Sequence, residues 1–311
     1  MKDGSVIPDL ARRVAGLVRE TMAEIRPRLV EAALSGQHGE NENTRHEDNF
    51  LSVYDLWMHQ RYKELLAEHI ASFVYASEEA DPEVIGTDPD PDLCVLVDPL
   101  DTSELAVRAL HGYTHVMVYS RLLARPVVSV VGDIFHHVQL YIGAQDAQGT
   151  DRAYIVTADS DVHVLSRRAP KDLSQALVTN YLMRPEERFA PLARQRAFLE
   201  ALSVSSGDGK ARGRIGVDFG SVGLCHVAAG FSDAMIEFAK GFAIWDLSPG
   251  HYILHAAGGI VIDLDGAPIS LDYHLDSQAN IASAMDRRQK FIAAGDATLA
   301  GGILNTLQSV P

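Results

Sequence analysis

The segment Leu93–Ser103, with the sequence LCVLVDPLDTS, joins a strand pattern to two carboxylates. Its run Cys94–Val97 is apolar and rich in valine, which is typical of a strand. Asp98 and Asp101 follow directly, so a turn after this strand can aim both side chains at one place. Two bare carboxylates this close repel each other, and a divalent cation such as Mg²⁺ would remove that cost. The spacing alone leaves two interpretations open, a metal site and a solvated acidic turn that caps a helix.

Composition narrows the class of protein. The chain has 311 residues, about two domains' worth, with 47% hydrophobic and 22% charged residues as in ordinary globular proteins. Its 42 acidic and 27 basic residues give a net charge of −15, which argues against a nucleic acid polymer or an anionic membrane as a partner. There are two cysteines, and neither a signal-peptide core nor a membrane-spanning apolar run is found. We therefore expect a cytoplasmic protein.

Two helices and a series of short strands are predicted for the N-terminal half. Apolar residues recur at helical spacing from Ile7 to Val30, and a second helix is expected over Asp55–Phe73 with Asp55 as its N-cap. Strand-like runs follow with little helix between them, which favours an antiparallel or mixed sheet. These runs are Val74–Ala76, Cys94–Val97, Val116–Leu122, Val127–Phe135 and Val138–Gly143.

Strands and helices alternate after Lys171, as in an α/β domain. The expected strands are Ala176–Thr179, Ile215–Phe219, Ala234–Phe238, Gly259–Ile262 and Ile281–Ala284. The expected helices are Pro185–Leu202, Ser221–Ala229, Leu247–Ala257 and Arg287–Leu299. The chain is therefore predicted to divide into two domains, residues 1–170 and residues 171–311.

Further motifs lie along the chain in a fixed order. They are Ser77-Glu78-Glu79, the D-P-L-D-T-S segment, Gly220-Ser221-Val222-Gly223, Trp245-Asp246 and Ala257-Gly258-Gly259. In this order and spacing they resemble the inositol monophosphatase family, over roughly residues 50–300. That family belongs to the Mg²⁺-dependent, lithium-sensitive sugar and inositol phosphatases, which include fructose-1,6-bisphosphatase.

The resemblance implies a fold and a function. The fold would be α/β, or layered α+β, as the alternating α-β-α-β-α sandwich of the inositol monophosphatase and fructose-1,6-bisphosphatase type. Residues 1–170 would hold most metal ligands, and residues 171–311 would carry Asp246 and the substrate-binding loops. The function would be Mg²⁺-dependent hydrolysis of a small sugar, cyclitol or nucleotide monophosphate, with two or three Mg²⁺ ions per site, lithium sensitivity and a homodimer.

The resemblance also assigns roles to particular residues. A first Mg²⁺ would be held by Glu78, Asp98 and the carbonyl of Leu100. A second would be held by Asp98, Asp101 and Asp246, which also borders the substrate. Asp55 and Glu78 would orient a water molecule or a weaker third ion. These residues would bring the metal ions and the attacking water to the phosphate.

Substrate contacts are implied in the same way. Ser103 stands for the family threonine that positions the attacking water, and the backbone N–H groups of Thr102 and Ser103 would face the phosphate. Ser221 lies in the motif at a helix start, and Glu237 and Lys240 lie near the place of an acidic contact to a substrate hydroxyl. The resemblance would therefore make these residues the substrate-binding set.

Some positions depart from the family pattern. Thr102 replaces its glycine, Ala239 occupies the place of the acidic substrate contact, and Arg45 is the nearest base in a loop that often carries lysine. We therefore expect a substrate other than inositol phosphate. An alternative is a family member that binds a phosphorylated ligand without turnover.

The segment after the predicted strand Gly259–Ile262 offers an alternative phosphatase motif. Ile262–Ala267, IDLDGA, superficially resembles the first motif of haloacid-dehalogenase phosphatases, in which Asp263 would be the nucleophile. Ala267 replaces the usual threonine or valine, and the remaining chain is too short for the later motifs. A plain turn is the favoured interpretation.

Overall fold

The chain forms two compact units. The computed structural model describes residues 7–43, 45, 50–166, 169–205 and 210–307. The first unit comprises residues 1–164 and 271–286, and the second comprises residues 165–270 and 287–311. The first break lies close to the predicted boundary after residue 170. The segment 271–286 differs from the prediction, because it belongs to the first unit.

Side chains at the end of a strand explain that difference. The Tyr119 hydroxyl donates a hydrogen bond to Asp272 Oδ1 at 2.9 Å, and the Arg121 guanidinium donates to the Asp276 carbonyl oxygen at 3.0 Å. The segment contains helix α8 (Gln278–Met285), whose first turn is capped by the side chain of Ser277. The strand predicted at Ile281–Ala284 is therefore wrong.

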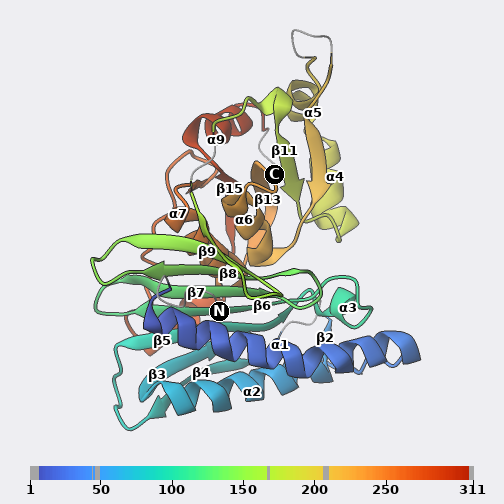
Figure 1. The fold of residues 1–311 in the computed structure, drawn as a ribbon. Coiled ribbons are helices and arrows are strands. Elements are labelled where there is room, and N and C mark those ends of the chain that lie inside the picture. The colour runs from blue at the N-terminus through green and yellow to red at the C-terminus, as the bar shows by residue number, and fades with distance from the viewer. Residues whose placement is uncertain (1–6, 44, 46–49, 167–168, 206–209, 308–311) are drawn as a thin grey trace. The chain divides into compact units, whose positions relative to one another are not determined.

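An eight-stranded sheet forms the centre of the first unit (Figure 1). The strand order is β10-β9-β8-β7-β6-β5-β3-β4, with antiparallel pairing from β5 to β9 and parallel pairing of β3 with β5. The mixed sheet expected from the sequence is thereby confirmed. The strands are β3 (Ser72–Ser77), β4 (Ala80–Gly86), β5 (Leu93–Asp101), β6 (Tyr113–Ser120), β7 (Arg125–Asp133), β8 (Val138–Gln145), β9 (Asp151–Thr157) and β10 (Val162–Leu165).

Two helices cover one face of this sheet. α1 (Asp9–Ser35) and α2 (Val53–His69) run side by side, and α1 packs on β7 and β8 while α2 packs on β5 (Figure 1). Their apolar faces join the strands in one buried cluster that includes Val18, Tyr62 and Val116. None of the helices within the described residues has both the length and the hydropathy of a membrane-spanning helix.

The start of α2 differs from the prediction. A short pairing of β1 (Glu40–Asn41) with β2 (Leu51–Ser52) leads into the helix, and Ser52 is the N-cap. Asp55 is the third residue of a capping box, where its Oδ2 accepts a hydrogen bond from the Ser52 backbone N–H at 2.8 Å. The prediction of Asp55 as the N-cap is therefore wrong, although its carboxylate does fix the helix start.

The second unit is built on a five-stranded sheet of order β12-β11-β13-β15-β14. β11 is parallel to β12 and β13, and β15 is antiparallel to β13 and β14. The strands are β11 (Leu177–Asn180), β12 (Arg214–Val217), β13 (Ala234–Phe242), β14 (Ile260–Ile262) and β15 (Gln289–Ala294). The helices are α4 (Ala190–Ala193), α5 (Arg196–Leu202), α6 (Gly220–Ala229), α7 (Ile244–Ala256) and α9 (Ala297–Leu304), with short turns at Leu173–Gln175 and Pro185–Phe189.

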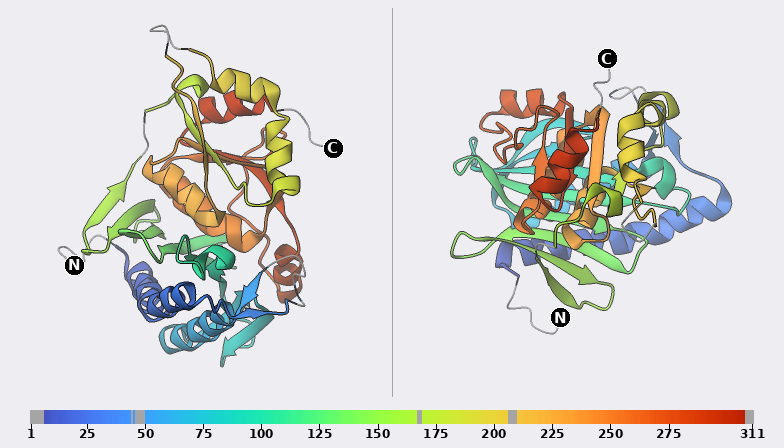
Figure 2. Two further views of the ribbon diagram at one scale, coloured as in Figure 1. Left: turned by 90° about the vertical axis from the view of Figure 1, so that its right-hand side faces the viewer. Right: turned by 90° about the horizontal axis from the view of Figure 1, so that it is seen from above.

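Helices lie on both faces of this second sheet (Figure 2). Phe198 of α5 and Ile303 of α9 share a buried cluster with Ile236 of β13. Gly223 of α6 lies against Met235, whose side chain points to the opposite face because neighbouring residues of a strand alternate. The layered α/β class expected from the sequence is confirmed.

Two helix predictions in this unit need correction. The segment predicted as one helix over Pro185–Leu202 is divided, because Gln195, with ψ of 64°, interrupts it between α4 and α5. The helix predicted over Arg287–Leu299 is wrong, since β15 occupies the first part and α9 begins after Asp296, which caps it. β15 is a central strand, so its buried residues do not show the alternation that would distinguish it from a helix.

Close packing of α1 on β7 gives a stability prediction. A Cβ at Gly132 would lie 2.8 Å from Val18 Cγ1 and would also meet Met22 Sδ, so these side chains of α1 would have to shift from their packed positions. We expect Gly132→Ala to lower the free energy of unfolding by about 1–3 kcal/mol, measured by urea denaturation. Gly16→Ala in α1 is the control, because its Cβ meets nothing within 4 Å and alanine favours the helix. Equal effects of the two substitutions would contradict this packing.

Candidate metal centre

The candidate centre lies in the first unit, where the last residues of β5 pair with β6. Asp98 lies opposite His115 and Asp101 lies opposite Tyr113, with a register shift between the two pairs. Residues three apart in a regular strand point to opposite faces, and one extra residue in a bulge brings them to the same face. The bulge therefore turns both aspartates toward one place.

The imidazole of His115 lies between the two aspartates. Its Nδ1 is 3.4 Å from Asp98 Oδ2, and its Nε2 is 3.3 Å from Asp101 Oδ2. One ligand atom from each residue falls within 4.8 Å of the others. His115 has an exposed fraction of 0% and Asp98 of 1%, and neither oxygen of Asp98 accepts a hydrogen bond of normal geometry from the described residues. Buried oxygens of this kind fit a bound cation.

Charge and burial oppose each other in this cluster. Burial raises the pKa of Asp98, and the His115 imidazole acts in the other direction. Burial lowers the pKa of His115, but its contacts with Asp101 and Asp98 outweigh that effect and raise the pKa to about 10. In the absence of a metal ion the imidazole therefore balances part of the negative charge.

A second group of residues connects α2 to the end of β5. The Ser103 hydroxyl lies 2.7 Å from the Leu100 carbonyl oxygen and also contacts Asp55 Oδ1. Burial raises the pKa of Asp55 to about 6, although hydrogen bonds from Ser103 and Ser52 oppose the shift. The predicted residues Asp55, Leu100 and Ser103 are thus directly joined.

Glu79 is a further member that sequence reasoning missed. Burial, followed by the charges of Asp55 and Asp98, raises the pKa of Glu79 to about 8, while Arg45 lowers it. The Glu79 carboxylate is therefore close enough to Asp55 and Asp98 to be affected by their negative charges. Glu78, the predicted ligand, pairs through its backbone N–H with the Val97 carbonyl at 3.1 Å. The metal-binding role of Glu78 stays a prediction.

His115 was also missed, for a different reason. It lies in the apolar run of β6, and its neighbours Val116 and Val118 are buried core residues. Only the cross-strand register of β5 and β6 places it beside Asp98, and the β-bulge that follows then brings Asp101 to the same place. For Glu79, by contrast, the adjacent pair of glutamates was a usable signal, but the motif alone could not choose between them.

Thr102 adopts the backbone geometry of a glycine. Its φ of 62° and ψ of 39° lie in the left-handed region, which costs a residue other than glycine about 1–3 kcal/mol. Its carbonyl oxygen accepts hydrogen bonds from Leu105 and Ala106 at 2.8 and 3.0 Å and begins the short helix α3 (Ser103–Ala106). The replacement of the family glycine therefore keeps the turn and adds a side chain at a cost in strain.

Asp246 and Ser221 belong to the second unit. The Ser221 hydroxyl donates to the Asp246 carbonyl oxygen at 2.7 Å and accepts from the Gly250 N–H at 3.0 Å. These bonds join the first turn of α6 to α7 and fix the backbone that carries the Asp246 side chain. The metal and substrate contacts of Asp246 and Ser221 stay predictions.

Glu237 and Lys240 lie at a turn of β13. Glu237 has an exposed fraction of 0%, and its Oε1 accepts hydrogen bonds from three backbone N–H groups of residues 239–241 at 3.0–3.2 Å. Its Oε2 lies 3.1 Å from Arg188 Nη1, while Lys240 Nζ lies 2.9 Å from Glu187. The Glu237 carboxylate holds this turn, and the substrate contacts of both residues stay predictions.

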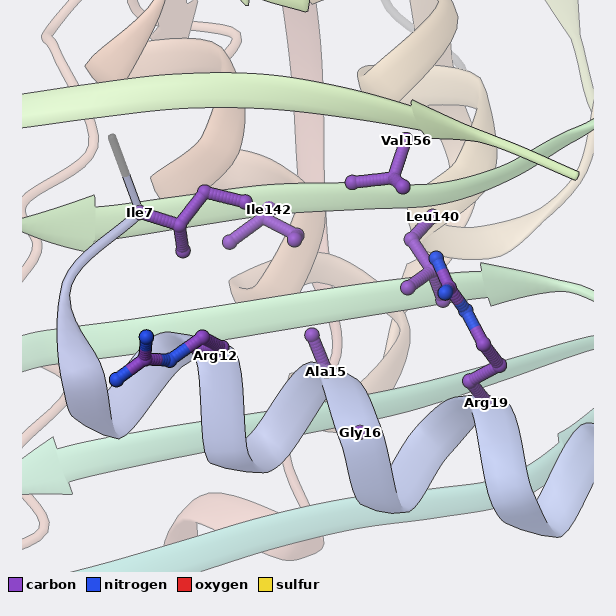
Figure 3. A pocket seen from close by; sticks show the side chains of 8 residues that line it. All are labelled: Ile7, Arg12, Ala15, Gly16, Arg19, Leu140, Ile142 and Val156. Carbon is purple, nitrogen blue, oxygen red and sulfur yellow. The ribbon is translucent and has the colours of Figure 1, made fainter. Parts of the chain in front are cut away.

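A small cavity lies apart from these acidic residues, between α1 and strands β8 and β9 (Figure 3). Its volume is about 50 Å³, which is room for no more than a few water molecules. The walls are mainly apolar, with Ile142 and Val156 among them, and Arg12 and Arg19 border it. It is too small for a sugar phosphate, so the carboxylate cluster remains the candidate site.

These features define a layered α/β protein with a buried, carboxylate-rich centre suited to hard cations. The chain belongs to the inositol monophosphatase family, whose sequence model matches residues 10–300.

Three similar proteins illustrate the relationship. The chain is 23% identical over 227 residues to the bifunctional NADP phosphatase/NAD kinase of Methanococcus maripaludis, covering 72% of this chain and 38% of the relative. It is 37% identical over 100 residues to inositol monophosphatase 2 of Homo sapiens, covering 32% of each. The chain thus spans less than two fifths of the length of these curated relatives. The structure of Mycobacterium tuberculosis SuhB matches with a TM-score of 0.63 at 18% identity, covering 96% of this chain and 95% of that one, and it shows the fold.

The raised pKa values of Glu79 and His115 make stability depend on pH. Glu79 and His115 have pKa values of about 8 and 10, raised from ordinary values of 4.5 and 6.5. From pH 7 to about pH 8 the unfolded chain has released both protons while the folded chain still holds them, and above that His115 alone keeps its proton, so stability falls as pH rises. We expect the Tm of the metal-free protein to fall by several degrees from pH 7 to pH 8.5, given about 2–4 °C per kcal/mol.

Scanning calorimetry in EDTA tests this expectation. Glu79→Gln should flatten the fall in Tm, and Glu83→Gln on the neighbouring strand is the control and should keep it. A Tm that rises over this interval in the unsubstituted protein would contradict the assignment.

Proposed function

We propose that this protein is a metal-dependent hydrolase of a small phosphate monoester. The main support is the bulge of β5, which turns the buried Asp98 and the partly buried Asp101 toward one place, while Ser103 joins the same stretch of chain to Asp55. Membership of the inositol monophosphatase family supports the reaction class. We propose two or three Mg²⁺ ions as the cofactor, because carboxylate and carbonyl oxygens suit that ion.

The proposed ligands are carboxylates and one backbone carbonyl. Glu78, Asp98, the Leu100 carbonyl and Asp101 would hold the ions, and Asp246 would add a further carboxylate. When bound, divalent cations lower the pKa of a coordinated water and neutralise charge on the phosphate. The residues of the chain would then have to orient that water and take up its proton.

Asp55 and Ser103 are the proposed catalytic pair for that task. Ser103 Oγ is held by the Leu100 carbonyl and by Asp55, so it is positioned to orient the water. Asp55 Oδ1 would accept the proton through the Ser103 hydroxyl, and a pKa of about 6 suits a base that works near neutral pH. Attack would be in line and would need no phosphorylated protein intermediate.

The proposed substrate is a sugar, cyclitol or nucleotide monophosphate. The names of the Methanococcus and human relatives support a phosphate on a ribose or cyclitol hydroxyl. The backbone of Thr102 and Ser103 would face the phosphate, and the other proposed substrate contacts are Ser221, Glu237, Lys240 and Asp246. Thr102 and Ala239 depart from the family pattern and favour a substrate other than inositol phosphate. A cytoplasmic homodimer is proposed from the family alone.

Phosphate release from a panel of inositol, sugar and nucleotide monophosphates tests the proposal. We expect turnover with Mg²⁺ that EDTA abolishes, and a loss of about 100-fold or more in kcat/KM for Asp101→Asn, since a metal ligand would be removed. Asp159→Asn is the control, because that side chain is 77% exposed. Equal rates for the two variants would remove Asp101 from the mechanism.

A second candidate function is ligand binding without turnover. The strained Thr102 at the proposed phosphate contact favours it, because an added side chain there restricts how closely a phosphate can approach. Calorimetry with the same panel separates the two functions. Tight binding with no phosphate release over hours would support the second candidate, whereas turnover would exclude it.

A further inference from the structure

His115 places a nitrogen donor inside a cluster of oxygen ligands. We propose that His115 Nε2 is itself a ligand of the divalent cation that Asp101 binds, so that the centre is a mixed nitrogen–oxygen site. Such a site would accept first-row transition ions such as Mn²⁺ or Co²⁺ as well as Mg²⁺, and the nitrogen would strengthen the binding of the transition ions only. The proposal deepens the proposed function, since it concerns the metal of the same site.

Distances between the donor atoms support shared coordination. His115 Nε2 and Asp101 Oδ2 are 3.3 Å apart, whereas charge-assisted hydrogen bonds measure roughly 2.7–2.9 Å. With metal–ligand bonds of roughly 2.1 Å, neighbouring ligands of an octahedral or tetrahedral ion lie roughly 3.0–3.4 Å apart. The observed separation therefore matches two atoms that share one cation better than it matches a direct ion pair.

The other ring nitrogen faces a carboxylate oxygen, which is the usual arrangement in metal-bound histidines. Nδ1 lies 3.4 Å from Asp98 Oδ2, on the far side of the ring from Nε2. Metal-bound histidines usually direct their second nitrogen at a carboxylate or carbonyl, which fixes the tautomer and the ring orientation. Asp98 can fill that role through Oδ2 and keep Oδ1 for a cation.

A purely structural ion pair leaves part of the cluster unexplained. Both oxygens of Asp98 are buried without a hydrogen bond of normal geometry from the described residues. A buried carboxylate is stable only when its remaining lone pairs are satisfied, and the imidazole at 3.4 Å and the backbone N–H of Leu100 do not supply enough donors. A cation within the cluster satisfies these oxygens.

The donor set determines the class of metal. Imidazole suits zinc, iron, nickel and copper, carboxylates suit magnesium, calcium and manganese, and affinities for divalent ions rise from Mn²⁺ through Co²⁺. Mg²⁺ is bound mostly by oxygen and gains little from a nitrogen ligand. Loss of His115 should therefore weaken Mn²⁺ and Co²⁺ binding and leave Mg²⁺ binding nearly unchanged.

Pulsed electron paramagnetic resonance of the Mn²⁺-loaded protein tests for the nitrogen directly. We expect nitrogen hyperfine coupling in the full chain that changes to the ¹⁵N pattern when only histidine is labelled with ¹⁵N. The coupling should be absent in His115→Gln and in His115→Phe, which keeps the ring volume if the glutamine variant does not fold. His137→Gln is the control, because that side chain is 65% exposed.

Calorimetric titration of the metal-free proteins supplies a second measurement. His115→Gln should bind Mn²⁺ and Co²⁺ about 10- to 100-fold more weakly, with Mg²⁺ changed by less than about threefold. Absence of histidine coupling in the unsubstituted protein, coupling that persists without His115, or an equal loss for Mg²⁺ would each overturn the proposal. None of these measurements depends on phosphate release, so a failure of the proposed function would be seen separately.

Discussion

A carboxylate removed from water at the end of a strand is the constraint on which the rest of this centre depends. Asp98 continues β5 into the interior of the sheet with an exposed fraction of only 1%. Burying an ionised carboxylate is costly unless positive charge and hydrogen-bond donors surround it. His115, which lies opposite on β6, meets that demand in part. Thr114, next to His115, donates its hydrogen bond to the backbone carbonyl of Asp98 and not to the side chain. The Asp98 carboxylate therefore still lacks donors and positive charge, and this deficit makes the cluster suited to a cation.

The local backbone is arranged around that cluster. The bulge between Asp98 and Asp101 brings two carboxylates to one face, and the left-handed Thr102 then turns the chain into α3. The capping box at Ser52 sets the first turn of α2 and thereby aims Asp55 at Ser103. The strand β5, its bulge and the start of α2 thus together position the side chains of Asp98, Asp101 and Asp55.

Much of this could be predicted from the sequence, and particular residues show why the rest could not. The D-P-L-D-T-S segment and the motifs around it were sufficient for the family and the layered fold, because motif order and spacing are linear properties. His115 could not be found, because its proximity to Asp98 depends on cross-strand register and its proximity to Asp101 depends on a one-residue bulge. The error over residues 281–299 has another cause, since short buried runs carry no period that distinguishes strand from helix.

The return of residues 271–286 to the first unit has a consequence for how this protein can be divided. Tyr119 and Arg121 find their partners in a segment that is translated only after most of the second unit. The first unit is therefore built from two separate segments of the sequence. Recombination or a gene fusion that exchanged one half of the coding sequence would leave the end of the central strand β6 without these partners.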